Sequence, residues 1–392
     1  MFRKITVFLC LICITLSVNA EALQNVGISK YAVLEVTKDN TPLREKDNED
    51  AKRISHLFSN PVLFADKQTD NYYRVELKEG EYSFINKKFV EVQAIIPEKR
   101  FEAISKITFK EDKKIYNLKI ETPMLSAFKA VEAGNNINFS IYDNRYDPFI
   151  VRTVNQSGRF YIPPKYDDSL NVFYTNDYPL FGYDVLPYDK GYIISVKKAP
   201  RINKRKPLKG IKVVIDAGHG GCEKGACAFN LEEKDINLQI ARILKRELRK
   251  RGAKVYMTRK KDKIGRASCR DDFAREKQAD ILLSIHQNSL PNPKDIDKKY
   301  GVGTYYYYEQ SKPLAQSILD NLTIATGFRD DGVNNRSFVL TRSTSQLSVL
   351  IECGYLIREQ EAMKLKQRHF QKIVAKAITK GCEDYLRKAY RI

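Results

Sequence analysis

The strongest constraint on the fold lies in the C-terminal half, where an apolar run of β-branched residues ends abruptly in a glycine-flanked histidine. Residues 213–217 read Val-Val-Ile-Asp-Ala and lead directly into Gly-His-Gly-Gly at 218–221. This pattern predicts a buried strand that delivers His219 onto a tight turn at its carboxyl end. A second apolar run ends in His286, and a third ends in Glu352. Because open α/β sheets bind ligands at the carboxyl ends of their strands, we expect these three side chains to share one site.

Stretches with helical periodicity alternate with these strands. Apolar residues at 236, 240, 243, 244 and 248 fall on one helical face, and Gly252 follows them. Further helices are expected at about 266–278, from 314 to Gly327, and around 370–378, with strands at 255–258 and 302–307 between them. Such alternation predicts an α/β fold for residues 210–392, with a twisted mixed sheet flanked by helices on both faces, in a phosphorylase/hydrolase-like arrangement.

Residues 31–199 have a different pattern, in which short apolar runs alternate with polar turns and helical periodicity is absent. The runs predict strands, and we expect two small, mainly β domains at 31–92 and 100–199. A basic segment closed by Pro207 follows, and we expect residues 200–209 to be a linker. The chain of 392 residues is also too long for one hydrophobic core.

The N-terminus matches a secretory signal peptide. Two basic residues precede an apolar run from 5 to 16, and small residues end at Ala20. Cleavage after Ala20 would remove residues 1–20, and no second long apolar stretch follows, so we expect no transmembrane segment in the mature protein. The protein is therefore expected to be exported to the periplasm or the extracellular cell envelope.

The formal net charge of +20 belongs almost wholly to the C-terminal half, in which 40 Lys and Arg residues face 22 Asp and Glu residues. A basic face attracts polyanions. Export favours acidic polymers of the cell envelope over nucleic acid, and a solvated basic surface without a specific partner remains the alternative. Signal cleavage would leave five cysteines, and the sequence does not assign a disulfide among them. They are Cys222, Cys227, Cys269, Cys353 and Cys382.

The C-terminal half resembles the catalytic domain of the zinc-dependent N-acetylmuramoyl-L-alanine amidases, the AmiC-like (amidase type 3) family. The resemblance rests on five motifs in the family's order and covers about residues 211–386. The motifs are VVIDAGHGG (213–221), EKD (233–235), TR (258–259), SIHQN (284–288) and LIECGY (350–355). It implies that His219, Glu233 and His286 bind one Zn²⁺ and that Glu352 is the catalytic carboxylate.

The residue chemistry is compatible with these roles to different degrees. Glycines around His219 allow a sharp turn, which a histidine that merely fills a core would not need. Glu233 competes with its neighbour Glu232, because an acid in the first turn of a helix is also a routine favourable charge. The family's EKD motif selects Glu233. Glu352 ends an apolar strand, and its alternative to a catalytic role is a structural ion pair with an arginine. We also expect Gly220 and Asn288 to contact the substrate.

Zinc held by two imidazoles and a carboxylate has a position open for water, and a further carboxylate beside it suits a general base. This arrangement predicts amide hydrolysis. The resemblance adds the bond, which joins N-acetylmuramic acid to the L-alanine of the peptidoglycan stem peptide. A zinc peptidase acting on stem peptides has the same ligand set and remains the alternative, followed by a non-catalytic envelope-binding protein.

Two further expectations follow from resemblance. The order of features in residues 31–92 resembles a bacterial SH3-like module, and residues 100–199 are similar to β modules that hold some cell-wall amidases at the envelope, although a plain spacer is equally compatible. Some amidases carry a long helix that plugs the zinc site until a partner protein removes it. Only residues 289–299 separate the SIHQN motif from the next strand, which is too short for such a helix. We therefore expect no obligatory activator.

Overall fold

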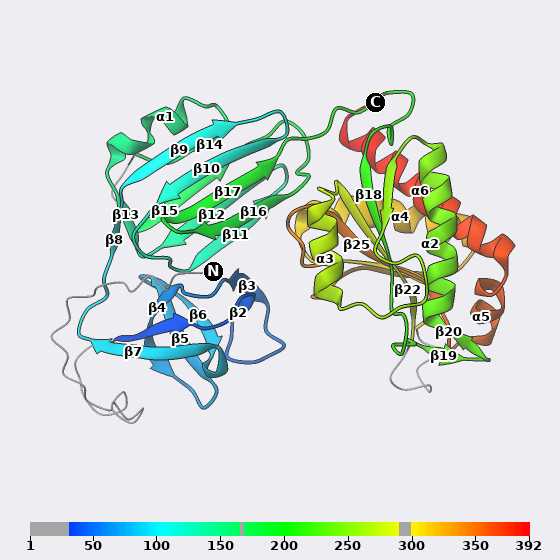
Figure 1. Ribbon diagram of the computed structural model, residues 1–392, viewed down its shortest axis with the longest axis horizontal. Coiled ribbons are helices and arrows are strands. Elements are labelled where there is room, and N and C mark those ends of the chain that lie inside the picture. Colours follow the sequence, from blue (N-terminus) through cyan, green and yellow to red (C-terminus); the bar gives the residue numbers. More distant parts are fainter. Residues whose placement is uncertain (1–30, 165–167, 290–298) are drawn as a thin grey trace. The chain divides into compact units, whose positions relative to one another are not determined.

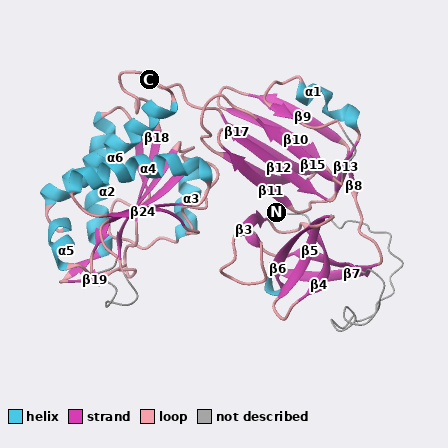
Figure 2. Ribbon diagram, turned by 180° about the vertical axis from the view of Figure 1, so that it is seen from behind, coloured by secondary structure: helices cyan, strands magenta, loops and turns pink. Residues whose placement is uncertain are grey.

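The computed structural model describes residues 31–164, 168–289 and 299–392. The expected signal peptide, residues 1–20, lies outside the described residues. The chain divides into two compact units, residues 1–100 and 101–392 (Figure 1). Figure 2 shows that the regular elements of residues 31–197 are mainly strands, joined by loops, whereas the long helices all belong to the C-terminal part. Within the described ranges, no helix is both long enough and apolar enough to cross a membrane.

The first unit is a seven-stranded antiparallel sheet in the order β3-β2-β6-β5-β4-β1-β7. Strand β1 alternates half-buried and buried residues, so Ala32, Leu34 and Val36 lie in the core. The strand pattern that the sequence predicts here is confirmed. Its strands are β1 (Tyr31–Val36), β2 (Thr41–Arg44), β3 (Arg53–Leu57), β4 (Val62–Gln68), β5 (Tyr72–Lys78), β6 (Glu81–Asn86) and β7 (Val90–Ile96).

Residues 102–197 form two four-stranded antiparallel sheets, in the orders β16-β17-β10-β9 and β11-β12-β15-β14, around one apolar core, and the two further strands β8 and β13 pair in parallel. The predicted β character of this region is confirmed, and one short helix, α1 (Arg152–Asn155), interrupts it. The strands are β8 (Glu102–Ile104), β9 (Lys106–Glu111), β10 (Ile115–Glu121), β11 (Phe128–Ala133), β12 (Asn136–Tyr142), β13 (Asn144–Tyr146), β14 (Phe160–Tyr161), β15 (Ser169–Tyr174), β16 (Tyr183–Tyr188) and β17 (Gly191–Lys197).

The C-terminal part is built on a six-stranded mixed sheet in the order β21-β18-β22-β25-β23-β24. Strands β21, β18, β22 and β25 are parallel, and β23 runs antiparallel to β25. Its strands are β18 (Lys212–Ala217), β21 (Lys254–Met257), β22 (Ile281–Asn288), β23 (Val302–Tyr306), β24 (Asp330–Asn335) and β25 (Leu347–Tyr355). A two-stranded ribbon, β19 (Cys227–Ala228) and β20 (Leu231–Glu232), lies in the connection that follows β18.

Helices cover both faces of this sheet, as the sequence predicts. Val213 and Ile215 point into the larger core with residues of α2, α4 and α6, whereas Val214 points into a smaller core with residues of α3. Successive residues of a strand face opposite sides, so a wholly apolar strand must be covered twice. The helices are α2 (Glu233–Lys250), α3 (Ala267–Glu276), α4 (Lys312–Thr326), α5 (Glu359–Leu365) and α6 (Arg368–Ala389).

Two features of this part differ from the pattern read in the sequence. Strand β24 has the sequence DDGVNN, which lacks apolar alternation, and it pairs with β23 at the edge of the sheet. Residues 200–209 contain no helix or strand, yet Leu208 is fully buried in the larger core. The end of the segment expected as a linker is therefore packed against the helices.

Candidate metal centre

The turn after β18 carries His219 in an unusual backbone conformation. His219 has φ = 60°, and Gly220 and Gly221 continue at 139° and 59°. Residues with side chains rarely adopt a positive φ, so the strain at His219 is typical of a functional position. Gly218 has a different role, because a Cβ on this residue would lie 2.3 Å from Cε1 of His286. The glycine thus lets the second histidine approach the turn.

Glu233 is the first residue of α2, and its side chain is buried between the two histidines. Its Oε2 lies 3.2 Å from Nε2 of His219, and its Oε1 lies 3.0 Å from Nδ1 of His286. The two imidazole rings are 5.0 Å apart between centroids. One ligand atom from each of the three residues falls within 4.8 Å of the others, a spacing that can accommodate a single metal ion.

The electrostatics of the cluster follow from this burial. Burial acts to raise the pKa of Glu233, but hydrogen bonds with His219 and His286 outweigh it and hold this pKa far below its usual range. The hydrogen bond with Glu233 raises the pKa of His219. The side chains of His219 and His286 retain 31% and 18% exposure, so the cluster is open to solvent on one side.

Glu352 lies next to this cluster on the central strand of the sheet. In the parallel pair of β22 and β25, Glu352 is the register partner of His286, and on the other side it pairs with Gly303 of β23. Its Oε2 is buried and has no hydrogen-bond partner among the described residues. Burial, followed by the charges of Glu233 and Asp331, raises the pKa of Glu352 well above its usual value. Gly303 adds no side chain beside this carboxylate.

A hydrogen-bond network that was not predicted from the sequence holds Glu233 in place. Nδ2 of Asn237, one helical turn along α2, donates to Oε1 of Glu233 at 3.1 Å and to the carbonyl of Gly218 at 3.2 Å. Gln287 donates from its backbone to Glu233 and from its side chain to Asn237. The spacing of four residues between Glu233 and Asn237 was the only signal of this network in the sequence.

Two arginines fix the turn that carries His219. Arg259, the arginine of the TR motif, donates to the carbonyls of Ala217, Gly218 and Lys234. Arg270 of α3 donates to the carbonyl of His219 at 3.0 Å and forms a buried ion pair with Asp216 at 3.1 Å. Pattern reading missed Arg270 and Asp216 because their pairing joins segments that are 54 residues apart.

Other residues considered in the sequence lie outside the cluster. Glu232 forms ion pairs with Lys224 and Lys234 rather than with the histidines. Asn288 ends β22, and its side chain lies 3.4 Å from the hydroxyl of Tyr305. The five cysteines of the described ranges are free thiols, so no disulfide joins them.

Gly220 and the two remaining histidines also lie outside it. Gly220 packs against the backbone of Lys263, because a Cβ added to Gly220 would lie 2.2 Å from the carbonyl oxygen of Lys263. His56 lies in β3 and His369 in α6. His219, Glu233 and His286 form the one metal-compatible group in the described part of the chain.

Comparison with known proteins places this cluster in a family. Residues 213–384 match the family model described as N-acetylmuramoyl-L-alanine amidase. The uncharacterized protein YqiI of Bacillus subtilis is 33% identical over 196 residues, which cover 49% of this chain and 93% of YqiI.

Two proteins named N-acetylmuramoyl-L-alanine amidases are also similar to this chain. The N-acetylmuramoyl-L-alanine amidase LytC of B. subtilis is 32% identical over 194 residues, and the match covers 50% of this chain but only 39% of LytC. The solved structure of the amidase AmiC2 of Nostoc punctiforme is 31% identical, with a TM-score of 0.43, over 46% of this chain and 99% of AmiC2.

Proposed function

Because this chain belongs to the N-acetylmuramoyl-L-alanine amidase family through residues 213–384, we propose that it hydrolyses peptidoglycan at the amide between N-acetylmuramic acid and L-alanine, using one Zn²⁺. The observation that carries the proposal is the convergence of His219, Glu233 and His286, from three separate elements, beside Glu352, whose Oε2 has no hydrogen-bond partner among the described residues.

The donor set fits zinc. Two imidazole nitrogens and one carboxylate oxygen are a common ligand set of catalytic zinc sites, which keep a further position open. The exposed sides of His219 and His286 leave room for that position. When bound, Zn²⁺ supplies Lewis-acid chemistry, because it polarises a carbonyl oxygen and lowers the pKa of water. We assign His219, Glu233 and His286 as the residues that would hold it.

Glu352 is assigned as the catalytic carboxylate. Its Oε2 would take a proton from the water that attacks the amide carbonyl and would then give that proton to the alanine nitrogen as the C–N bond breaks. Because Oε2 makes no internal hydrogen bond among the described residues, nothing there competes for it. Asn288 and Gly220 are proposed to contact the substrate, since they flank the two histidines along the chain.

The experiment that tests this function is mass spectrometry of peptidoglycan digested by the mature protein with zinc. An amidase releases whole stem peptides with a free L-alanine amine and leaves intact glycan strands. Products cut within the stem peptide would instead establish the alternative, a zinc peptidase. Intact peptidoglycan after prolonged digestion would favour the non-catalytic envelope-binding protein.

The N-terminal parts are proposed to act at the cell envelope. We propose residues 31–92 as a bacterial SH3-like module and residues 100–199 as an envelope-binding or spacer module, and the observed β sheets of both regions support this division. We propose that residues 1–20 direct export. The site would then meet its substrate in the periplasm or the extracellular envelope, with no role for nucleic acid.

We predict that the enzyme needs no activating partner. The connection between β22 and β23 contains residues 290–298, which lie outside the described residues, and its short length in the sequence is the basis of the prediction. Purified mature protein with zinc should release stem peptides from peptidoglycan at a rate that added cell extract does not change. Strict dependence on a second protein would contradict this expectation.

Replacing Asn237 by alanine should weaken zinc binding without abolishing it. The change removes the side chain that orients Glu233 and ties it to the carbonyl of Gly218. Loss of such an outer partner typically costs 10–100-fold in metal affinity, so we expect the dissociation constant of zinc to rise by roughly this factor. Competition with a chelator measures it. Asn321→Ala, which removes comparable hydrogen bonds on α4, should leave zinc affinity unchanged.

A further inference from the structure

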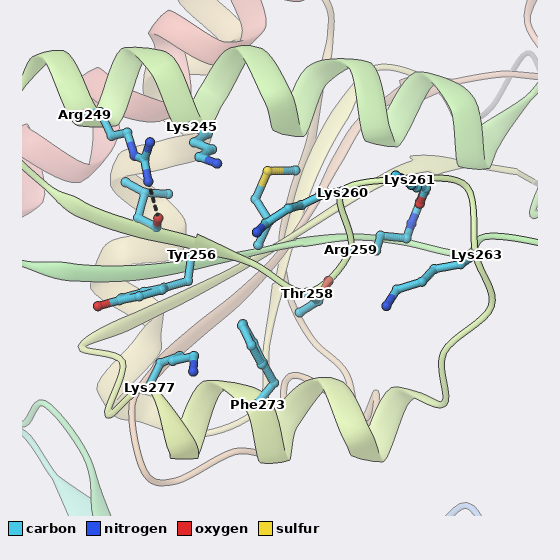
Figure 3. A pocket seen from close by; sticks show the side chains of 12 residues that line it. Lys245, Arg249, Tyr256, Thr258, Arg259, Lys260, Lys261, Lys263, Phe273 and Lys277 are labelled. Atoms are coloured by element: carbon cyan, nitrogen blue, oxygen red, sulfur yellow. Dashed lines mark hydrogen bonds between the residues drawn. The ribbon is translucent and has the colours of Figure 1, made fainter.

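A basic groove lies at the free edge of the catalytic sheet, outside the candidate metal centre. Its volume is about 560 Å³. Figure 3 shows Lys245 and Arg249 reaching into it from α2, and Phe273 of α3 and Lys277, which follows α3, on the other side of the edge strand β21. We call it the lysine groove. It is lined by Lys245, Arg249, Val255, Tyr256, Met257, Thr258, Arg259, Lys260, Lys261, Lys263, Phe273 and Lys277.

The lysine groove concentrates positive charge, and most of its lysines have no counter-ion among the described residues. Seven of its lining residues are Lys or Arg and none is acidic. Four of the lysines form no ion pair with any carboxylate in the described ranges, namely Lys245, Lys260, Lys261 and Lys263. The neighbouring Asp262 is directed away, toward Lys234 at 2.8 Å and the backbone of Gly221 at 2.7 Å.

Several cationic side chains of the groove lie close enough to repel one another. Burial, then the charges of Arg249 and Lys260, lower the pKa of Lys245. Clefts lined by charges of one sign concentrate ions of the opposite sign. A volume of about 560 Å³ exceeds the needs of a single small anion and suits a segment of a chain that carries several charges.

The side chains that remain available suit phosphate groups. Arg259 is committed to backbone carbonyls, and Arg249 donates to the carbonyl of Val255 at 3.2 Å. The ligand therefore meets mainly lysine ammonium groups, which bind phosphate as mobile point charges and need no bidentate geometry.

The aromatic residues of the groove argue against nucleic acid. Lys277 lies over the rings of both Tyr256 and Phe273, at 6.0 and 5.1 Å from their centroids. Proteins that bind single-stranded nucleic acid stack bases on open aromatic faces. Because the ammonium group of Lys277 already lies over one face of each ring, these rings are less available to unpaired bases.

We propose that the lysine groove binds a linear phosphodiester polymer without bases, such as a chain of alditol phosphates, and holds the enzyme on an envelope that contains it. The proposal rests on the proposed function for its location at the cell envelope. Arg259 lines the groove and also binds the turn that carries His219, so a polymer in the groove would lie beside the metal-binding loop.

The test measures binding of a synthetic oligo(glycerol phosphate) to the mature protein in about 0.1 M salt. Lys245→Gln with Lys260→Gln should weaken binding at least tenfold and lower the slope of log affinity against log salt by roughly two, because each lost phosphate contact contributes about one. Lys372→Gln with Lys376→Gln removes the same charge from the exposed side of α6 and should change affinity less than twofold. Lys245→Arg with Lys260→Arg should retain binding.

Three outcomes would overturn the proposal. In the first, the α6 control variant binds oligo(glycerol phosphate) as weakly as the groove variant does. In the second, the protein binds single-stranded DNA or poly-glutamate as tightly as oligo(glycerol phosphate). In the third, the protein hydrolyses peptidoglycan but does not bind oligo(glycerol phosphate). Thermal melting of each variant checks that it is folded. The binding assay does not depend on amide hydrolysis. A protein that binds oligo(glycerol phosphate) but lacks amidase activity would therefore contradict the proposed function and not the proposed role of the lysine groove.

Discussion

Replacing Glu352 by glutamine is expected to lower kcat for amide hydrolysis by roughly 10²–10⁴-fold, the usual contribution of a general acid-base group. Glutamine keeps the size of the side chain but cannot accept the proton of the attacking water. Because Glu352 is not one of the three residues that form the metal-compatible group, the variant should still bind one zinc ion per chain. Stem-peptide release and metal content, measured on the same preparation, separate these two expectations.

The matched control for this variant is Glu359→Gln, which changes an exposed glutamate in the first turn of α5. It should hydrolyse peptidoglycan at the wild-type rate. A Glu352→Gln variant that retains near wild-type activity would refute the role of Glu352 as base. Loss of zinc from the same variant would instead show that Glu352 belongs to the ligand set.

Replacing His219 by alanine should remove zinc binding almost completely. Removing a residue that only hydrogen-bonds to a metal ligand typically lowers metal affinity 10–100-fold. Loss of one of the three ligands should therefore lower zinc affinity by more than about 100-fold and reduce hydrolysis to background. A second readout is thermal stability. Zinc at 100 times its dissociation constant should stabilise the wild-type protein by about 2.7 kcal/mol, and the variant should lose this stabilisation.

His369→Ala provides the control, because His369 is exposed on α6 and lies outside the metal-compatible group. This variant should keep both zinc-dependent stabilisation and activity. If zinc stabilised His219→Ala as strongly as the wild-type protein, the metal would have to bind elsewhere in the chain.

Much of the catalytic fold could be predicted from the sequence because its signals are local. The apolar runs before His219 and His286 are too long and too uniform for surface loops, and both form central strands. Gly327 ends α4 in the left-handed conformation that glycine favours, as its position after the apolar stripe suggested. Helix α2 begins at Glu233, earlier than the apolar stripe, because its first turn is mostly polar.

The rest depends on contacts between distant segments, which leave no periodic pattern. The pairing of Asp216 with Arg270 and the support of Glu233 by Gln287 appear only when separate strands and helices meet. The choice between Glu232 and Glu233 illustrates the same limit, since adjacent acids look alike in sequence but point to lysines in one case and to histidines in the other. The lysine groove likewise combines α2, β21 and α3.

The most direct test of the central claim is anomalous X-ray diffraction, above the zinc absorption edge, from crystals of the protein grown with zinc. We predict one anomalous peak between the side chains of His219, Glu233 and His286, with the carboxylate of Glu352 facing the open side of the ion. A peak bound by other residues, or none at this cluster in zinc-loaded crystals, would contradict the account.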